Sequence, residues 1–371
     1  MNEQHKIAML GHKHVLSREG GIEIVVKELS TRMVAKGHQV TCYDRKTHHV
    51  SGSDLDKRKE YKGVRIAPVW TIEKKGLAAM TSSLSAAWKA TWGKYDVVHI
   101  HAEGPAVMSW LPKIRKKKVI VTIHGLDWAR AKWGGFATKY IKWGEKQAVK
   151  YADEIIVLSR GVQEYFQREY GRKTVFIPNG VSKSKVIPAE EITKRWDLRK
   201  DGYILFLGRI VPEKGLWYLI EAWKNIHTDK KLVIAGGSSD TQTFMDELKT
   251  IAGDNVIFTG FQQGEVLEEL YSNAYIYTLP SDLEGMPLSL LEAMSYGNCC
   301  VVSDIPECSD VVEDKAVCFP KGSAEGLRAV LQDLLDKPDK VARYKQEAAE
   351  FITAKYNWDD VVDRTLMLYS K

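Results

Sequence analysis

Two glutamates eight residues apart, Glu284 and Glu292, are the side chains best suited to hold a polar ligand. They lie in the stretch Pro280 to Asp304, which reads PSDLEGMPLSLLEAMSYGNCCVVSD. Pro287 suits the first position of a helix, which predicts Met286 as the N-cap. Such a helix presents unpaired backbone N–H groups, and the positive end of its dipole, to the preceding loop.

This geometry gives the two glutamates different expected tasks. Glu284 would lie at the mouth of the helix, where it and the N–H groups of Gly285, Met286 and Leu288 would hold a sugar ring by its hydroxyls. Glu292 lies about a turn and a half into the helix and would accept hydrogen bonds from the two hydroxyls of a ribose. The alternative is an ordinary surface helix with two solvated glutamates.

Two cations in the segment GRIVPEKG are suited to bind the phosphate groups of a ligand. Arg209 and Lys214 follow a predicted strand and place a guanidinium fork and an ammonium near one small volume, as a diphosphate requires. The alternative is a solvated pair of loop cations. Together with the glutamates they predict a nucleotide-sugar pocket, and we expect residues around Gly237 and Phe261 to select the donor.

The N-terminal half offers weaker candidates. Gly20 and Gly21 precede a predicted helix and would let the backbone approach a phosphate, although tight turns need glycine as often. His124 follows a predicted strand and is a candidate catalytic residue, although histidines in such places are often structural. Asp127 would orient His124 or bind an acceptor, and Glu103 is a further acceptor-binding candidate.

A metal centre is not expected. His99 and His101 share one face of a predicted strand, but no third ligand lies near them in sequence, so packing is the favoured reading. Asp54 and Asp56 form a D-x-D pair inside a charged segment that looks solvated. The cations and the helix N-terminus can neutralise a diphosphate without a metal.

The composition is that of a globular protein with two domains: 371 residues, 44% hydrophobic and 27% charged. No apolar run is long enough to span a membrane, and no signal peptide is recognisable at the N-terminus. The five cysteines form no C-x-x-C pair, which favours reduced thiols and a cytoplasmic location.

The net charge of +6 conceals two unlike halves. Residues 1–185 hold 34 lysines and arginines against 17 acidic residues, whereas residues 186–371 hold 20 against 31. The basic half also contains seven of the eleven tryptophans, interleaved with lysines: Trp70, Trp88, Trp92, Trp110, Trp128, Trp133 and Trp143. This pattern suits an anionic membrane surface; the alternative is core tryptophans beside a solvated basic face.

Short apolar runs alternate with helical periodicity along both halves, which predicts the α/β class with doubly wound parallel sheets. The predicted strands are residues 6–11, 40–43, 96–100, 119–123, 154–158, 203–207, 231–235, 256–259, 275–279, 300–302 and 316–319. We expect two Rossmann-like domains facing a central cleft. An acceptor-binding domain would cover residues 1–182, with the C-terminal helix 357–371 packing back on it, and a nucleotide-sugar-binding domain would cover residues 183–356. We interpret residues 182–199 as an irregular linker.

Five segments in order resemble the retaining GT-B glycosyltransferases of family 4: GGIEIVVKELS, TIHG, IPNGV, LGRIVPEKG and EGMPLSLLEAMSYG. The resemblance runs from about residue 6 to the end, and the spacing of Glu284 and Glu292 is similar to the family's E-x7-E signature. The segments SREGGIEIVVKELSTRMVAKGH and HGLDWARAKWG look most like bacterial transferases that add rhamnose or similar sugars to lipid-linked glycans of the capsule or cell wall.

The resemblance implies roles for these residues. Arg209 and Lys214 would bind the donor diphosphate and stabilise the leaving group, while Glu292 would bind the ribose. Glu284, Gly285, Met286 and Pro287 would contact the donor sugar. Gly21 would contact the diphosphate, and His124 would contact the sugar near the reacting carbon.

The expected reaction is sugar transfer from a UDP- or dTDP-sugar to a polyprenyl-diphosphate-linked saccharide, with retention of configuration and no metal or other cofactor. It would take place at the inner face of the cell membrane. Two other functions remain open. One is a nucleotide-sugar epimerase or hydrolase on the same fold. The other is a nucleic-acid-binding protein that uses the basic half, which would bind in a salt-sensitive way.

Overall fold

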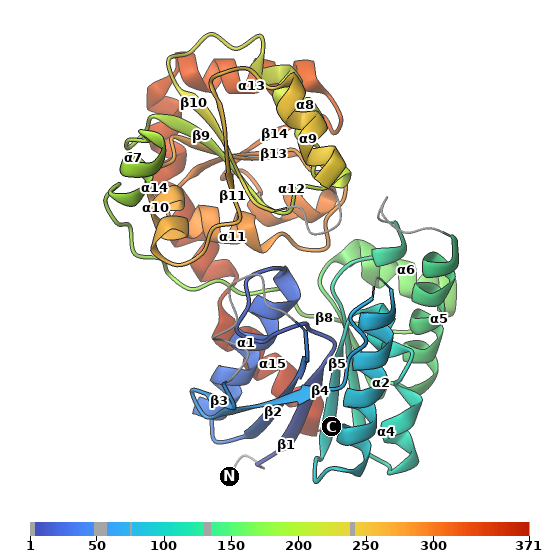
Figure 1. Ribbon diagram of the computed structural model, residues 1–371. Helices are drawn as coiled ribbons and strands as arrows, with labels where there is room; N and C mark the ends of the chain where they lie inside the picture. Colours follow the sequence, from blue (N-terminus) through green and yellow to red (C-terminus); the bar gives the residue numbers. More distant parts are fainter. Residues whose placement is uncertain (1–3, 48–57, 75, 130–134, 238–241, 371) are drawn as a thin grey trace. The chain divides into compact units, whose positions relative to one another are not determined.

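The computed structural model describes residues 4–47, 58–74, 76–129, 135–237 and 242–370 (Figure 1). The chain divides into two compact units. Unit 1 consists of Met1–Asn179 together with Trp358–Lys371, and unit 2 consists of Gly180–Asn357. The chain therefore leaves unit 1 after residue 179 and returns to it at residue 358, close to the boundaries of 182 and 357 expected from the sequence.

Unit 1 is built on a sheet whose described strands follow the order β3-β4-β2-β1-β5-β6-β7-β8. All neighbours pair in parallel except β3 and β4, which form an antiparallel edge. The central strands are apolar runs that are buried on both faces, as parallel sheets require. The strands are β1 (Lys6–Leu10), β2 (Gln39–Arg45), β3 (Glu60–Tyr61), β4 (Val64–Val69), β5 (Val97–His101), β6 (Lys118–Ile123), β7 (Glu154–Val157) and β8 (Val175–Phe176).

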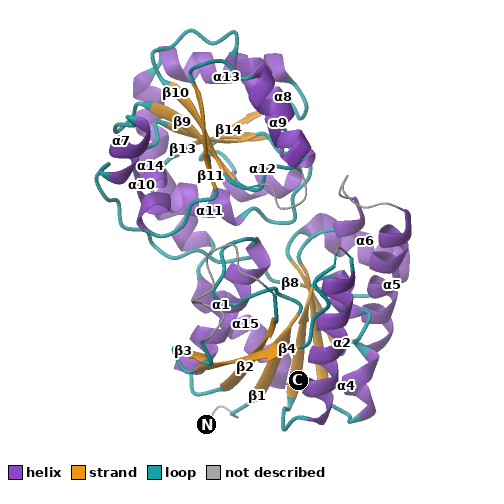
Figure 2. Ribbon diagram, viewed as in Figure 1, coloured by secondary structure: helices purple, strands orange, loops and turns teal. Residues whose placement is uncertain are grey.

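Helices cover both faces of this sheet (Figure 2). Helices α1 and α15 lie on one face, and α2, α4, α5 and α6 lie on the other (Figures 1 and 2). The helices of unit 1 are α1 (Gly21–Ala35), α2 (Leu77–Trp92), α3 (Glu103–Ala106), α4 (Trp110–Ile114), the 3-10 turn η2 (Asp127–Ala129), α5 (Gly135–Tyr151), α6 (Arg160–Tyr170) and α15 (Trp358–Ser370).

Unit 2 repeats the plan with a parallel sheet whose described strands follow the order β11-β10-β9-β12-β13-β14. Its strands are β9 (Tyr203–Leu207), β10 (Lys231–Ala235), β11 (Val256–Gly260), β12 (Ile276–Leu279), β13 (Cys299–Ser303) and β14 (Val317–Phe319). Its helices are α7 (Glu191–Trp196), the 3-10 turn η3 (Pro212–Lys214), α8 (Leu216–Trp223), α9 (Gln242–Ile251), α10 (Glu265–Asn273), α11 (Leu288–Ser295), α12 (Pro306–Val312), α13 (Ala324–Asp336) and α14 (Pro338–Lys355). The predicted fold class is confirmed, and the strands that were predicted agree with the observed bounds to within a residue or two. The prediction missed β3, β4 and β8 of unit 1.

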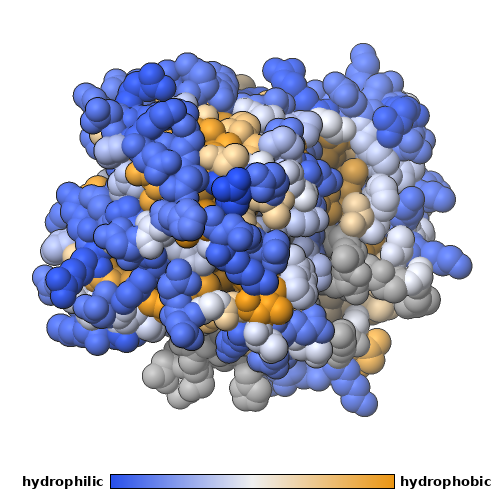
Figure 3. All heavy atoms as spheres, turned by 90° about the horizontal axis from the view of Figure 1, so that it is seen from above, coloured by the Kyte–Doolittle hydropathy of each residue, from blue (hydrophilic) through white to orange (hydrophobic). Residues whose placement is uncertain are grey.

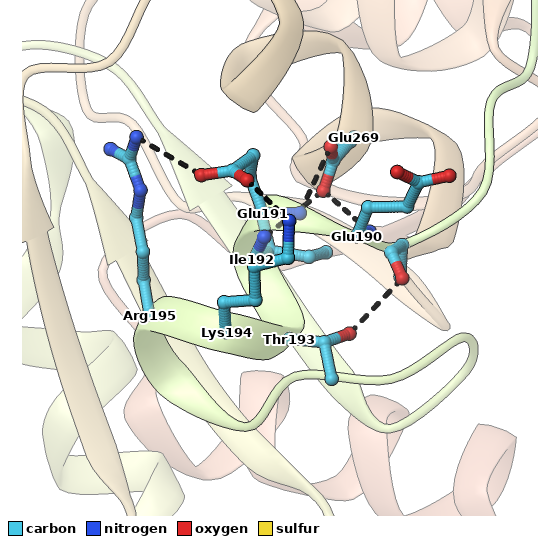
Figure 4. Close-up of polar contacts among 8 residues, drawn as sticks. Glu190, Glu191, Ile192, Thr193, Lys194, Arg195 and Glu269 are labelled. Carbon is cyan, nitrogen blue, oxygen red and sulfur yellow. Dashed lines mark hydrogen bonds and ion pairs between the residues drawn. The ribbon is translucent and has the colours of Figure 1, made fainter.

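The segment predicted as an irregular linker instead contains helix α7, and that prediction was wrong. The carboxylate of Glu269, on α10, accepts hydrogen bonds from the backbone N–H groups of Glu190, Glu191 and Ile192 at 2.9, 3.1 and 3.0 Å (Figure 4). These are N–H groups that a helix start leaves unpaired. A buried side chain nearly eighty residues further along the chain therefore caps α7, and local sequence patterns do not reveal it.

The C-terminal helix α15 packs in unit 1, beside α1. Tyr369 is buried, and its hydroxyl is bonded to Nδ1 of His99 on β5 at 2.6 Å. Ion pairs at the rim join Arg32 to Asp359 and Lys36 to Asp363. Helix α15 therefore contributes a buried side chain to the core of unit 1 and ion pairs to its surface.

Candidate functional site

The order of the strands in unit 2 reverses between β9 and β12. Beyond the carboxyl ends of parallel strands, such a reversal leaves a crevice in which open α/β sheets bind ligands. The loop after β9 carries Arg209 and Lys214, and the loop after β12 carries Glu284. The topology therefore brings these three predicted site residues to one edge of one sheet.

Lys214 and Glu284 form an ion pair within this edge, with side chains that are only 12% and 9% exposed. The Ser281 hydroxyl donates to the same carboxylate oxygen, Oε1 of Glu284, at 2.6 Å. An ammonium has three donors, so this contact leaves others for a ligand. The sequence assigned the two residues to different parts of a donor, whereas the structure joins them into one polar unit.

Close packing fixes the two loops against each other. Gly215 has φ +67°, and a Cβ built on it would lie 1.8 Å from the carbonyl oxygen of Pro280, so only glycine fits. The backbone N–H of Asp282 donates to the carbonyl of Glu213 at 2.9 Å, and the Tyr218 hydroxyl donates to the Asp282 carboxylate at 3.1 Å. These contacts hold Lys214 and Glu284 in a fixed relation without a ligand.

Helix α11 begins one residue later than predicted. Pro287 is the N-cap, with extended backbone at φ −77° and ψ 104°, and Leu288 is the first helical residue. The prediction of Pro287 at the first helical position, with Met286 as the cap, was therefore wrong. The side chains of Met286 and Leu288 are buried, so these residues offer a ligand their backbone rather than their side chains.

Glu292 lies on α11 and is held by a residue that the sequence did not point to. The Tyr271 hydroxyl, from α10, lies 3.2 Å from Oε2 of Glu292 and 3.3 Å from the carbonyl oxygen of Ser289. Tyr271 is fully buried and belongs to an apolar helix face, where a tyrosine gives no sign of a role in positioning. It nevertheless orients the carboxylate predicted to bind ribose.

Gly237 and Phe261 lie at the ends of β10 and β11, beside the loop that carries Arg209. The Ile210 N–H donates to the Gly237 carbonyl at 3.1 Å, and a Cβ on Gly237 would lie 3.5 Å from Phe261 Cβ. A Cβ on the preceding Gly236 would lie 1.8 Å from the backbone oxygen of Gly208. These predicted donor-selecting positions therefore share the sheet edge with the cations.

In unit 1 the strand order reverses between β1 and β5. Gly20 is the N-cap of α1 and Gly21 its first residue. The carboxylate of Glu23 lies at this N-terminus of α1. Its Oε1 accepts a hydrogen bond from the Lys13 N–H at 2.9 Å, and a Cβ built on Gly20 would lie 2.7 Å from its Oε2. The α1 N-terminus therefore has an internal carboxylate next to the two predicted glycines.

His124 follows β6, and its Nε2 lies 3.0 Å from Nδ1 of the buried His101. The ring of His101 stacks on that of His99, with centroids 4.2 Å apart. Burial lowers the pKa of His99 to about 3 and that of His101 well below its usual range, so both rings are neutral. His99 is packed, as expected, between Tyr369 and the hydroxyl of Thr122, which lies at 2.7 Å.

Glu103 differs most from its expected place. It is fully buried, and its Oε1 accepts from the backbone N–H of Asp127 at 2.9 Å. Burial, with Asp127 adding to it, raises the pKa of Glu103 well above its usual range. This carboxyl holds the loop that carries Asp127, so of the two acceptor-binding candidates only the half-buried Asp127 is reachable from solvent.

In the described ranges no three histidine, cysteine or acidic side chains are grouped as a metal site would need. Asp54 and Asp56 lie outside the described residues, as does Trp133. Within the described part of the chain, no helix has both the length and the hydropathy needed to cross a bilayer.

Comparisons with known proteins agree with this architecture. The family model Glycosyltransferase Family 4 matches residues 19–185, and the model Glycosyl transferases group 1 matches residues 189–351. An uncharacterized glycosyltransferase of Methanocaldococcus jannaschii is 27% identical, with 98% of this chain and 97% of that protein covered.

Two further proteins are similar to this chain. The UDP-Gal:alpha-D-GlcNAc-diphosphoundecaprenol alpha-1,3-galactosyltransferase of Escherichia coli is 29% identical over 65% of this chain and 64% of its own length. The crystal structure of Anabaena HepE in complex with UDP and glucose superimposes with a TM-score of 0.82 at 15% identity, covering 99% of this chain and all of the other. With a family 4 domain followed by a group 1 domain on the GT-B fold, the chain is a glycosyltransferase.

Proposed function

We propose that the protein transfers a hexose or deoxyhexose, with rhamnose among the candidates, from a UDP- or dTDP-sugar to a polyprenyl-diphosphate-linked saccharide. The observation that carries the proposal is the polar edge of unit 2, where Arg209, the Lys214–Glu284 pair and the Tyr271-held Glu292 follow β9 and β12. The UDP in HepE and the diphosphate-linked acceptor of the Escherichia coli enzyme support this choice of substrates.

Each group at this edge has a task that fits its chemistry. Arg209 and Lys214 neutralise the donor diphosphate as negative charge develops on the leaving oxygen. Glu284 accepts from donor-sugar hydroxyls while it holds Lys214, and Glu292 accepts from the ribose. The acceptor hydroxyl attacks the anomeric carbon on the face that the diphosphate leaves. The carbon–phosphate-oxygen bond breaks, a carbon–acceptor-oxygen bond forms, and the departing phosphate oxygen takes the acceptor's proton, so configuration is retained.

The proposed reaction takes place at a membrane and needs no metal ion. We place the reaction at the inner face of the cell membrane of a bacterium, in polysaccharide assembly, because a polyprenyl acceptor is confined to a bilayer. The charge on the diphosphate is met by protein cations, so transfer should continue in the presence of a metal chelator. His124, Asp127 and the Gly20–Gly21 turn lie in unit 1, and their roles stay predictions.

The test is a panel of UDP- and dTDP-sugars with a polyprenyl-diphosphate saccharide. We expect Arg209→Ala to lower kcat/KM by about 100-fold, the usual effect of removing one group that stabilises developing charge. Lys214→Met should do the same and also release Glu284. Lys224→Ala removes an exposed cation paired with Glu221 and is the matched control. If both site variants keep activity within about threefold of the wild type, the assignment is wrong.

The same assay separates the alternatives. A nucleotide-sugar epimerase or hydrolase turns over its donor at a comparable rate without acceptor. A nucleic-acid-binding protein shows salt-sensitive binding to DNA or RNA and ignores nucleotide-sugars. The ion pair of Lys214 with Glu284 at a sheet switch point favours the transferase over the nucleic-acid alternative, because it mixes charges where a phosphate backbone would call for cations alone.

A further inference from the structure

Helix α2 has its apolar residues arranged in the opposite way to an ordinary surface helix. Its buried side is made of small residues: Ser82, Ser83, Ala86, Ala87, Ala90 and Thr91. Its large apolar residues face outward instead. Leu84, Trp88 and Trp92 follow at intervals of four and are 46%, 56% and 53% exposed. Residues four apart lie above one another on a helix, so these three form a continuous apolar stripe.

The sequence of α2, LAAMTSSLSAAWKATW, contains a single charged residue, Lys89. A helix on the surface of a globular protein normally carries charged or polar residues on its outer face. The core does not require the outward tryptophans either, because the buried side is complete without them. Their position therefore calls for a partner outside the unit.

Helix α4 extends the stripe. It packs against α2, and its Trp110 and Ile114, again four apart, are 39% and 58% exposed. The guanidinium of Arg115, which directly follows α4, lies 5.1 Å from the centre of the Trp92 ring and connects the two helices. We name Leu84, Trp88, Trp92, Trp110 and Ile114 the Trp face. On the side of the molecule drawn in Figure 3, hydrophilic residues dominate, and hydrophobic residues show in smaller areas between them.

The surroundings of the Trp face are basic. Lys89, Lys94, Arg115 and Lys116 are exposed beside it. Between residues 77 and 118 the only acidic residues are Asp96, which accepts from the Lys6 N–H at 2.8 Å, and the fully buried Glu103. Of these two only Asp96 is exposed, and its Oδ2 is engaged by the Lys6 N–H, so the four exposed cations outnumber the one exposed carboxylate of this segment.

We propose that the Trp face docks on an anionic lipid bilayer. Tryptophan is enriched where hydrocarbon meets water, because its ring is apolar and its N–H stays hydrated. A ring of cations adds attraction to anionic headgroups. A second copy of this chain is a poorer occupant, because a two-fold contact uses the same surface on both copies and would bring two basic patches together. The choice of a bilayer agrees with, and in part rests on, the proposed lipid-linked acceptor.

Binding is tested by sedimentation of the full-length protein with vesicles, without donor or acceptor. We expect binding to phosphatidylcholine vesicles containing about one third phosphatidylglycerol, and much weaker binding to pure phosphatidylcholine. Trp88→Ser with Trp92→Ser should lower the partition coefficient by about 30-fold or more, since two large apolar side chains no longer enter the interface. Trp217→Ser, which changes a tryptophan of unit 2 that is 41% exposed, is the matched control and should bind like the wild type.

A second variant separates charge from apolar contact. Arg115→Gln with Lys116→Gln should weaken binding to the anionic vesicles and reduce its salt dependence, while circular dichroism confirms that all variants are folded. The proposal is overturned if the wild type stays in the supernatant, if the Trp88/Trp92 variant binds like the wild type, or if light scattering shows a dimer that this variant dissociates.

The docking proposal and the proposed function fail separately. The Trp88/Trp92 variant should keep wild-type rates on a short, water-soluble acceptor analogue and lose rate only on a bilayer-embedded acceptor. Vesicle binding without any sugar transfer would contradict the proposed function and leave docking intact. Transfer without vesicle binding would contradict docking alone.

Discussion

The capping of α7 by Glu269 allows a quantitative prediction. Glu269 is 1% exposed and accepts three backbone N–H groups at 2.9 to 3.1 Å. A hydrogen bond to a charged group contributes about 1.5 to 3 kcal/mol. Three such bonds set an upper limit of about 5 to 9 kcal/mol, but a six-residue helix can fray and expose its N–H groups to water. We therefore expect Glu269→Ala to destabilise unit 2 by about 3 to 5 kcal/mol, the usual effect of breaking a buried charged contact.

Glu269→Gln separates charge from shape. An amide keeps one acceptor oxygen but turns an NH2 group toward a backbone N–H, so we expect a smaller loss of about 2 kcal/mol. Glu268 is the matched control, since it is exposed and neighbours Glu269 on α10. Glu268→Ala should change stability by less than about 0.5 kcal/mol.

The assay is guanidinium unfolding followed by circular dichroism, combined with amide hydrogen exchange at residues 190–192. Glu269→Ala should lower the unfolding midpoint by about 1 M and remove the protection of these three amides. The reasoning is refuted if Glu269→Ala and Glu268→Ala unfold alike, or if the amides stay protected in the absence of the carboxylate.

Further predictions concern the buried titratable groups. Unfolded histidines take up protons below about pH 6.5, whereas folded His99, whose pKa burial lowers to about 3, does not, so stability should fall as pH drops from about 6.5 toward 3. The expected loss from His99 is about 2 kcal/mol at pH 5, and His101, whose pKa is also lowered, adds a loss in the same direction. Comparing urea midpoints of the wild type and His99→Gln at pH 7 and pH 5 measures the His99 part. Because burial raises the pKa of Glu103, ionising it costs stability as pH rises, and Glu103→Gln should stabilise the protein increasingly from pH 5 to 8 in thermal unfolding; a destabilised variant at pH 8 would contradict this. Cys318, half-buried whereas the other four thiols are buried, should react first with a thiol reagent in the native state, and Cys318→Ser should remove that fast phase.

The central strands were predictable because parallel strands are buried on both faces, and buried runs such as KIAML and YILFL stand out from their neighbours. The missed strands are only two residues long, as β3 and β8, or partly exposed, as β4. The edge that gathers Arg209, Lys214 and Glu284 was predictable for a related reason, since all three follow strands and parallel strands end at one edge. The strands and the residues that directly follow them are thus determined by short stretches of sequence.

Other features depend on partners distant in sequence. Helix α7 was missed because its cap comes from Glu269, and the pairing of Lys214 with Glu284 spans seventy residues. Glu103 looked like a ligand because nothing in its segment shows that it is buried. The outward tryptophans of α2 were ambiguous because that helix is apolar or small on all sides, so its periodicity does not reveal which side meets the sheet.

The return of α15 to unit 1 sets an order of assembly during synthesis. Unit 2 is one uninterrupted segment and can fold once residue 357 has left the ribosome. The described strands of the unit 1 sheet have all been synthesised by residue 176, but the hydrogen-bond partner of His99, Tyr369, has not. At a synthesis rate of about 5 to 20 residues per second, Tyr369 is added about 10 to 40 seconds later. During that interval the face of the sheet that α15 later covers is bare, and it is the surface that a chaperone of the nascent chain would have to protect.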